Sequence, residues 1–203
     1  MFEPFFAQFR EAKPPAATVW PSPPQPGWLE LLNEHGGATF DDGLYRLHTP
    51  ETSARADEAV GAAFPDLRGQ VRCFGFDWLG QQFAIDLRAP EPESVRMAEP
   101  GTGQVLVLPA SFAGFHDSLL ESYRDAALAS DFFASWAAGH LDALPLRPDR
   151  CIGYRVPLFL GGRDELNNLE ETDIWVYWEI AGQLLECTRD LPTGARISGV
   201  DLT

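Results

Sequence analysis

The sequence predicts an α+β fold with a single hydrophobic core. Apolar residues make up 45% of the 203 residues and aromatic residues 12%, which is enough for one well-buried core in a chain of this length. Patterns typical of strands fill the stretch from about residue 38 to residue 109, and helical patterns follow it. Because strands and helices come in separate runs, we expect a mostly antiparallel sheet packed with N-terminal and C-terminal helices.

The first 26 residues are expected to form a helix and an extended arm, ahead of a single domain over residues 27–203. Six prolines between Lys13 and Pro26 favour an extended chain that wraps the surface. The helix over residues 1–12 is predicted by the helical spacing of four aromatic side chains, Phe2, Phe5, Phe6 and Phe9.

Cap and turn residues divide the chain that follows. Pro26 and Gly36-Gly37 bound a short helix, Asp41-Asp42-Gly43 predicts a hairpin turn, and Thr49 can cap a helix that starts at Pro50. The elements expected up to residue 109 are helices over 28–35 and 50–63, a hairpin over 38–48, and strands over 71–78, 82–87, 94–98 and 104–108.

The rest of the chain is expected to be mainly helical. We predict helices over 115–129 and 131–138, a strand over 151–160 and a loop over 167–173. Asp173 can cap a last helix, whose apolar positions from Ile174 onwards follow the helical period until Leu191-Pro192 ends it.

The charge of the chain is strongly negative. Thirty acidic residues against 15 basic ones give a net charge of −15 and a pI near 4.5. Such a surface repels nucleic-acid phosphates and anionic membranes, and it attracts basic partners. Acidic surfaces also simply keep proteins soluble, and that interpretation carries equal weight.

Features that would direct the protein out of a reducing cytosol are missing from the sequence. The three cysteines are odd in number and include no Cys-x-x-Cys pair, which argues against a disulfide framework. No secretory leader pattern and no apolar run of about 18 residues occurs. We expect the protein to stay in the cytoplasm.

Motifs of known chemistry are absent as well. The four histidines are scattered, so no metal site and no cofactor is expected. Ser111 lacks the glycines of a nucleophile elbow, and neither Gly101–Gly103 nor Gly161-Gly162 has the context of a phosphate-binding loop. Asp77 and Asp86 stand among apolar strand residues and could act as acid or base, but hydrogen bonds to turn amides or pairing with an arginine is the favoured interpretation.

The strongest local feature is an acidic segment from Asp164 to Glu186, which holds seven acids and no basic residue. Trp175 lies in it off the apolar stripe of the last helix, whereas Tyr177 and Trp178 lie on the stripe. Aromatic anchors with a charged rim are typical of protein interfaces. The expected partner-binding residues are Asp164, Glu165, Glu170, Glu171, Asp173 and Trp175; the alternative is a solvated acidic face.

Several blocks of the sequence resemble the GAD-like type VI secretion immunity proteins, which are related in role to the SUKH-type immunity proteins. The resemblance covers about residues 27–197. The residues that carry it are Gly43, Leu44, Tyr45, Asp77, Trp78, Asp86, Pro157, Gly161, Gly162, Asn168, Leu169, Tyr177 and Trp178. Most of these glycines and aromatics are expected to serve the fold.

The resemblance implies a non-enzymatic protein that binds and neutralises a cognate toxin in the cytoplasm. A nuclease is the expected toxin, since its basic groove would complement the acidic chain. Two alternatives stay open. One is a small-molecule or nucleotide-sensing module, or a regulator, with a pocket near Trp78, Asp86 and Arg88. The other is an enzyme that uses Asp77 or Asp86.

Overall fold

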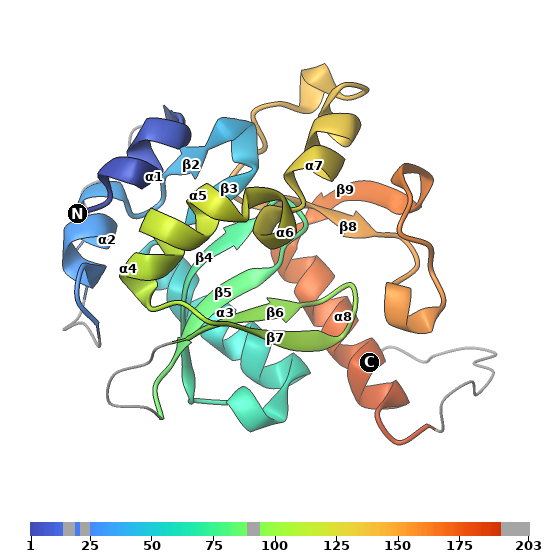
Figure 1. The fold of residues 1–203 in the computed structure, drawn as a ribbon. Helices are drawn as coiled ribbons and strands as arrows, with labels where there is room; N and C mark the ends of the chain where they lie inside the picture. The colour runs from blue at the N-terminus through green and yellow to red at the C-terminus, as the bar shows by residue number, and fades with distance from the viewer. Residues whose placement is uncertain (14–18, 21–24, 89–93, 192–203) are drawn as a thin grey trace.

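The predicted α+β fold is confirmed by a computed structural model, which describes residues 1–13, 19–20, 25–88 and 94–191 (Figure 1). The described sheet is antiparallel throughout, and its seven strands are neighbours in chain order. They are β1 (Glu11–Lys13), β2 (Thr39–Phe40), β3 (Tyr45–Leu47), β4 (Val71–Asp77), β5 (Gln82–Asp86), β6 (Val95–Glu99) and β7 (Gln104–Leu108).

Helices cover both faces of this sheet. On one face, α3 (Pro50–Ala63) and α8 (Ile174–Thr188) pack on apolar side chains of β4 and β5. The other face carries the larger, mostly aromatic core, so the prediction of a single core is corrected: the sheet divides the buried residues into two clusters. The helices that contribute to it are α1 (Glu3–Gln8), α2 (Trp28–His35), α4 (Phe112–Gly114), α5 (Leu120–Ser122), α6 (Arg124–Leu128) and α7 (Ser130–Ala137).

A bulge in β4 lets one strand serve both cores. The register with β5 shifts between Cys73 and Gly75, so Phe74 is the extra residue on β4. One extra residue reverses the side-chain alternation. Phe74 therefore faces the aromatic core, while Cys73 and Phe76 both face α3 and α8.

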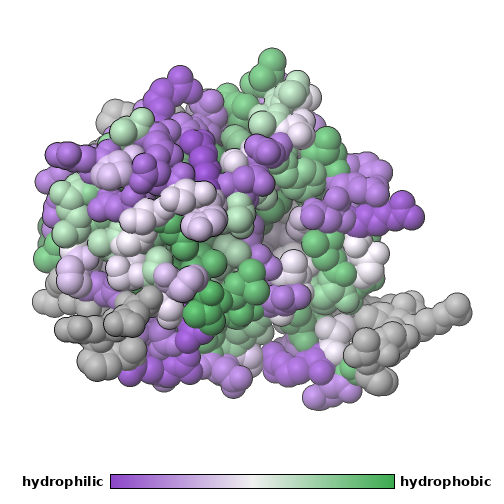
Figure 2. Space-filling view, in the orientation of Figure 1, coloured by the Kyte–Doolittle hydropathy of each residue, from purple (hydrophilic) through white to green (hydrophobic). Residues whose placement is uncertain are grey.

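The far edge of the sheet is formed by β7, whose only strand neighbour among the described residues is β6. Leu106 and Val107 of this strand are exposed. In the space-filling view, hydrophobic residues gather low in the centre of the face, where Figure 1 draws β7 (Figure 2).

Predicted helix caps are confirmed. The Thr49 hydroxyl accepts a hydrogen bond from the amide of Thr52 at the start of α3, and the Asp173 carboxylate accepts from two amides of α8. The predicted hairpin turn is a short 3₁₀ turn over Asp41–Gly43 in which Asp42 has a φ of 59°.

The prediction of one continuous helix over 115–129 is wrong, because the helix there is interrupted twice. Phe115–Leu119 forms a π-helical turn between α4 and α5, and the chain leaves helical geometry at Tyr123 before α6. The first helix is also shorter than expected, and Phe6 lies outside its buried face. Most of the proline-rich arm lies outside the described residues.

Two predictions for the C-terminal third are corrected. The strand expected over 151–160 is β8 (Arg150–Tyr154) followed by a 3₁₀ turn over Leu158–Leu160. The loop expected over 167–173 contains β9 (Leu169–Asp173), which pairs with β8 as a separate two-stranded sheet. Glutamates are depleted in strands, but an edge strand tolerates charge, which is why this strand gave no sequence signal.

No helix in the described part of the chain combines the length and apolar character needed to cross a membrane.

Candidate functional site

The candidate acidic residues lie on the β8–β9 hairpin and the segments next to it. Glu170, Glu171 and Asp173 belong to β9, while Asp164 and Glu165 lie in the loop before it. The two loop acids and the two glutamates of β9 are exposed, whereas Asp173 and Trp175 are half-buried. The hairpin that presents these acids is therefore the structural basis of the site.

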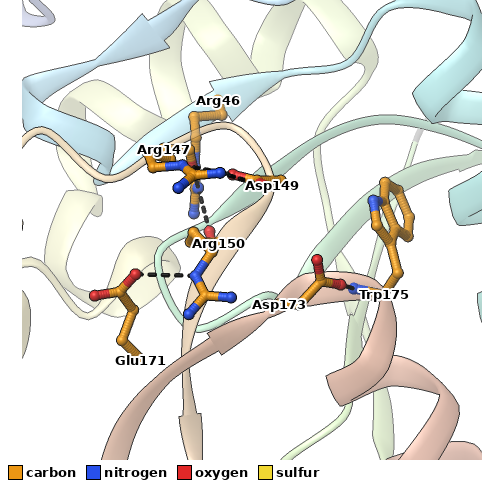
Figure 3. A network of polar contacts seen from close by, with 7 residues as sticks. All are labelled: Arg46, Arg147, Asp149, Arg150, Glu171, Asp173 and Trp175. Carbon is orange, nitrogen blue, oxygen red and sulfur yellow. Dashed lines mark hydrogen bonds and ion pairs between the residues drawn. The ribbon is translucent and has the colours of Figure 1, made fainter.

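Arg46 attaches this hairpin to the main sheet (Figure 3). Its guanidinium donates hydrogen bonds to the carbonyl oxygens of Arg147 and Arg150, at the start of β8, and to that of Asp77 in β4. The side chain is fully buried and stacks on Phe76, 4.3 Å from the ring centroid. Burial lowers the pKa of Arg46 to about 10, so it is still charged at neutral pH.

Neighbouring positions of β9 place their side chains on opposite faces of the hairpin. Glu171 pairs with Arg150, with 2.9 Å between Arg150 Nε and the carboxylate (Figure 3). Glu170 faces the other way and lies 3.5 Å from Arg155 Nε. The two glutamates thus do not form one continuous patch.

The acidic segment is less negative in space than in sequence. Glu165 lies 3.7 Å from Arg163, so three of the candidate acids have an arginine partner. All three arginines precede residue 164, which is why counting charges within the segment did not reveal them. Exposed pairs of this kind contribute little to stability, so a stronger partner could displace them.

Asp173 and Trp175 serve the helix that follows them. Asp173 Oδ1 accepts hydrogen bonds from the amides of Trp175 and Val176 at 2.9 and 3.1 Å (Figure 3). The indole of Trp175 lies under the guanidinium of Arg55 from α3, 4.4 Å from the ring centroid. Trp175 is therefore not the freely exposed anchor that the sequence predicts, because α3 covers part of it.

Two exposed apolar residues of α8 were missed at the sequence level. Val176 is 47% exposed and Ile180 is 40% exposed. They are four residues apart and so share one face of the helix, with the exposed Glu179 beside them. Two exposed apolar side chains with one exposed acid between them are therefore present on α8, and Trp175 is not part of this group.

Asn168 makes three hydrogen bonds to the loop that carries Asp164 and Glu165. Asn168 accepts a hydrogen bond from the amide of Val156 and donates to the carbonyls of Val156 and Arg163. A Cβ on Gly162 would lie 1.8 Å from the Val156 carbonyl oxygen, so only glycine fits there. The 3₁₀ turn that opens this loop is preceded by Pro157 and ends at Gly161, whose φ of 87° favours glycine.

The other motif residues make contacts within the fold. Trp78 and Trp178 are buried, and their indoles donate to the carbonyls of Leu128 and Gly80. Tyr177 accepts from the amide of Tyr154 and so joins α8 to β8. The remaining members of this set are buried in the core or its turns: Gly43, Leu44, Tyr45 and Leu169.

Asp77 and Asp86 both have structural partners. Asp77 is fully buried and accepts hydrogen bonds from the amide and side chain of Gln81. Burial raises its pKa well above the usual value. Asp86 is held by Arg88 and Arg96, and the hydrogen bonds from Arg88 hold the pKa of its carboxyl below the usual range. These contacts match the structural interpretation of both carboxylates.

In the described residues, no group of three or more His, Cys, Asp or Glu side chains is placed to hold a metal ion. Cys73 and Cys151 are buried free thiols whose pKa values burial raises.

Two cavities of the described residues lie at the two ends of the β6–β7 hairpin. One of about 580 Å³ lies beside the end of β7 and is largely apolar, with Leu108, Leu119 and Tyr123 in its lining. The other, of about 190 Å³, lies between the β6–β7 turn, α6 and the loop that carries Asp164. The alternative of a small-molecule-binding module expects a pocket near Trp78, Asp86 and Arg88. None of these three residues lines either cavity.

Comparison with known proteins matches the C-terminal part of the chain to a family. Residues 115–185 fit the model of the T6SS immunity protein Tdi1, C-terminal. This supports the resemblance to type VI secretion immunity proteins. The match covers about a third of the chain and includes the β8–β9 hairpin and every candidate acidic residue. The finer relation to GAD-like and SUKH-type proteins stays a prediction.

The fold is also found among solved structures. The chain is similar to the crystal structure of Atu4351 from Agrobacterium tumefaciens, with a TM-score of 0.61 and 16% identity over 90% of this chain and 89% of that chain. At this identity the likeness shows the fold alone. No curated protein matches the chain.

Proposed function

We propose that this protein is a type VI secretion immunity protein that neutralises a toxin by binding it in the cytoplasm. The observation that carries the proposal is the match of residues 115–185 to an immunity protein model. The toxin that we infer is a basic protein, with a nuclease as the expected class. A net charge of −15 supports that choice, because it attracts a basic surface and speeds the encounter.

The proposed contact surface, here called the hairpin–helix surface, combines the β8–β9 hairpin and the start of α8. Its apolar centre is Val176 and Ile180, and its acidic rim includes the candidate acids and Glu179. Because Glu170 and Glu171 point to opposite faces of the hairpin, a toxin that contacts both of them would have to enclose the edge formed by β9. This arrangement fits the usual composition of an interface, in which a small apolar centre carries most of the binding energy and charges surround it. Glu165, Glu170 and Glu171 would then exchange their arginine partners for basic groups of the toxin.

Reversing the rim charges tests the electrostatic part of the proposal. The triple substitution Glu165→Lys, Glu170→Lys and Glu171→Lys should slow association with a candidate basic toxin, because it removes the attraction between the surfaces. The measurement is a binding assay across a salt series, with circular dichroism to check folding. The matched control reverses three exposed acids elsewhere, Glu58, Glu121 and Asp142. An equal decrease of the association rate in both variants would mean that the overall charge of the protein, and not this surface, speeds association.

Polar substitution of the apolar centre tests the position of the surface. Val176→Ser with Ile180→Ser should raise the dissociation constant by on the order of a hundredfold, mainly through faster dissociation, since central apolar residues carry binding energy. The matched control is Leu106→Ser with Val107→Ser, which changes two exposed apolar residues on β7. Unchanged toxin binding in a folded Val176/Ile180 variant would place the contact elsewhere.

A further inference from the structure

The 190 Å³ cavity beside the hairpin is lined by an unusual concentration of hydrogen-bond acceptors. A water occupies about 30 Å³ of liquid, so a cavity of this size can hold a polar group larger than a single water. The lining residues that matter are Gln81, Glu99, Thr102, Phe132, Tyr154 and Asp164. They come from the β4–β5 turn, the β6–β7 hairpin, α7, β8 and the following loop, so the fold brings five segments together here.

Gln81 presents an acceptor without a donor. The residue is only 9% exposed, and its Nε2 donates to Asp77 at 2.8 Å. That bond leaves Oε1 as the amide atom available to the cavity, and Oε1 has no hydrogen-bond partner among the described residues. A buried carbonyl in this state is costly, and a donor entering the cavity would relieve that cost.

Two carboxylates of the cavity have hydroxyl partners only. Glu99 accepts from Thr102 at 2.6 Å, and Asp164 accepts from Tyr154 at 2.7 Å. In the described part of the chain neither carboxylate lies in an ion pair, although Glu165, next to Asp164, does. Each carboxylate can accept further hydrogen bonds, and partial burial raises the pKa of Glu99, as expected of a carboxylate without a nearby cation.

We propose that this cavity binds the guanidinium group of an arginine side chain that the toxin inserts. A guanidinium carries five N–H donors and one positive charge in a plane, which suits two carboxylates and an amide carbonyl that all need donors. The aromatic rings of Phe132 and Tyr154 line the same cavity, and they favour the weakly hydrated, stacking guanidinium over the ammonium of lysine. This inference rests on the proposed toxin-binding function, and Asp164 joins the cavity to the hairpin–helix surface.

The site can be tested without the toxin. The full chain, labelled with ¹⁵N, is titrated with N-acetyl-arginine amide, and the backbone amide signals of Gln81 and Thr102 are followed by NMR. The uncharged analogue N-acetyl-citrulline amide and N-acetyl-lysine amide serve as comparison probes. We expect saturable millimolar binding of the arginine probe, and binding at least about tenfold weaker for both comparison probes, because each lacks either the charge or the planar donors.

Two pairs of substitutions complete the test. Glu99→Gln with Asp164→Asn keeps the size of both side chains and should weaken arginine binding by about tenfold or more. Glu58→Gln with Glu121→Gln removes the same charge away from the cavity and should leave it unchanged. Equal binding of arginine and citrulline probes, or unaltered affinity in the Glu99/Asp164 variant, would overturn the site. The proposed function would survive that result if Val176→Ser with Ile180→Ser still weakens toxin binding. If the protein binds the arginine probe but does not bind the toxin, the proposed function is wrong. The cavity would then still bind arginine, but the arginine would not come from a toxin.

Discussion

His116 shows how a single buried polar side chain can be fixed by its surroundings. It lies in the π-helical turn and is fully buried among aromatic rings, including Phe5 and Phe74. The carbonyl of Phe112 can only accept a hydrogen bond, so Nδ1 carries the proton, and Nε2 accepts from the Tyr45 hydroxyl. Burial lowers the pKa of His116 to about 4, and His48 is shifted to about 4 for the same reason.

This burial makes stability depend on pH. Because the folded pKa of His116 lies below the unfolded value of 6.5, the unfolded chain binds more protons below pH 6.5, and stability falls as the pH falls towards 4. Between pH 6.5 and about 5 the loss should be about 2 kcal/mol per histidine. The raised pKa of Asp77 acts in the opposite sense, so the total slope alone does not isolate His116.

The double variant Tyr45→Phe with His116→Phe isolates the effect. It removes both partners of the Tyr45–His116 hydrogen bond but also the donor to the Phe112 carbonyl, so stability at neutral pH should fall somewhat and the readout is the change of stability with pH. Urea unfolding at pH 7, 6 and 5 should show a smaller loss than in the parent, by about 2 kcal/mol. NMR of the parent ring nitrogens should show a neutral Nδ1–H form down to about pH 5. A ring that gains a proton near pH 6.5 in the folded protein would contradict the assignment.

The β8–β9 hairpin depends on the main sheet for its position. It is a separate two-stranded sheet, and such a pair is only marginally stable alone. Arg46 joins it to β3 and β4 through main-chain carbonyls, and the Tyr177 hydroxyl of α8 accepts a hydrogen bond from the Tyr154 amide of β8. Any surface on this hairpin is therefore positioned by buried contacts some distance from the acids themselves.

Arg46→Met should destabilise the protein by about 3 kcal/mol or more, because the carbonyls of Arg147, Arg150 and Asp77 lose their donor and Phe76 loses the guanidinium above its ring. Arg147→Met is the matched control: it breaks only an exposed ion pair with Asp149 and should change stability by less than about 1 kcal/mol. Urea unfolding measures both, and hydrogen exchange of β8 amides reports local opening. Equal stability of the two variants would show that Arg46 does not hold the hairpin.

Most elements could be predicted from the sequence where local signals are strong. The strands of the meander, the cap at Thr49 and the cap at Asp173 follow from alternation and from residue type. The site was harder to predict because its features depend on distant segments. The arginines that pair with the acids, the cover of Trp175 by Arg55 and the cavity around Gln81 all come from tertiary contacts.

Across the whole molecule, charge and burial are distributed unevenly. Both faces of the main sheet are covered by helices, and the buried residues form one large aromatic core and one smaller core. The net charge of −15 acts over the entire surface and, at neutral pH and low salt, keeps copies of the chain apart. The same charge would raise the association rate of the proposed basic toxin, because it attracts over a longer range than local contacts do.

The open edge at β7 makes colloidal behaviour depend on that repulsion. On the side away from β6, β7 has no strand neighbour in the described part of the chain, so its backbone groups and its exposed Leu106 and Val107 could pair with the same strand of a second copy. Light scattering should stay low at neutral pH and rise as the pH approaches the pI near 4.5, where repulsion vanishes. Val107→Lys should reduce this rise far more than Val176→Lys, an equal charge change on α8. Equal light scattering by the two variants would mean that the protein does not associate through the β7 edge. Purification and storage of this protein therefore call for buffers well above its pI.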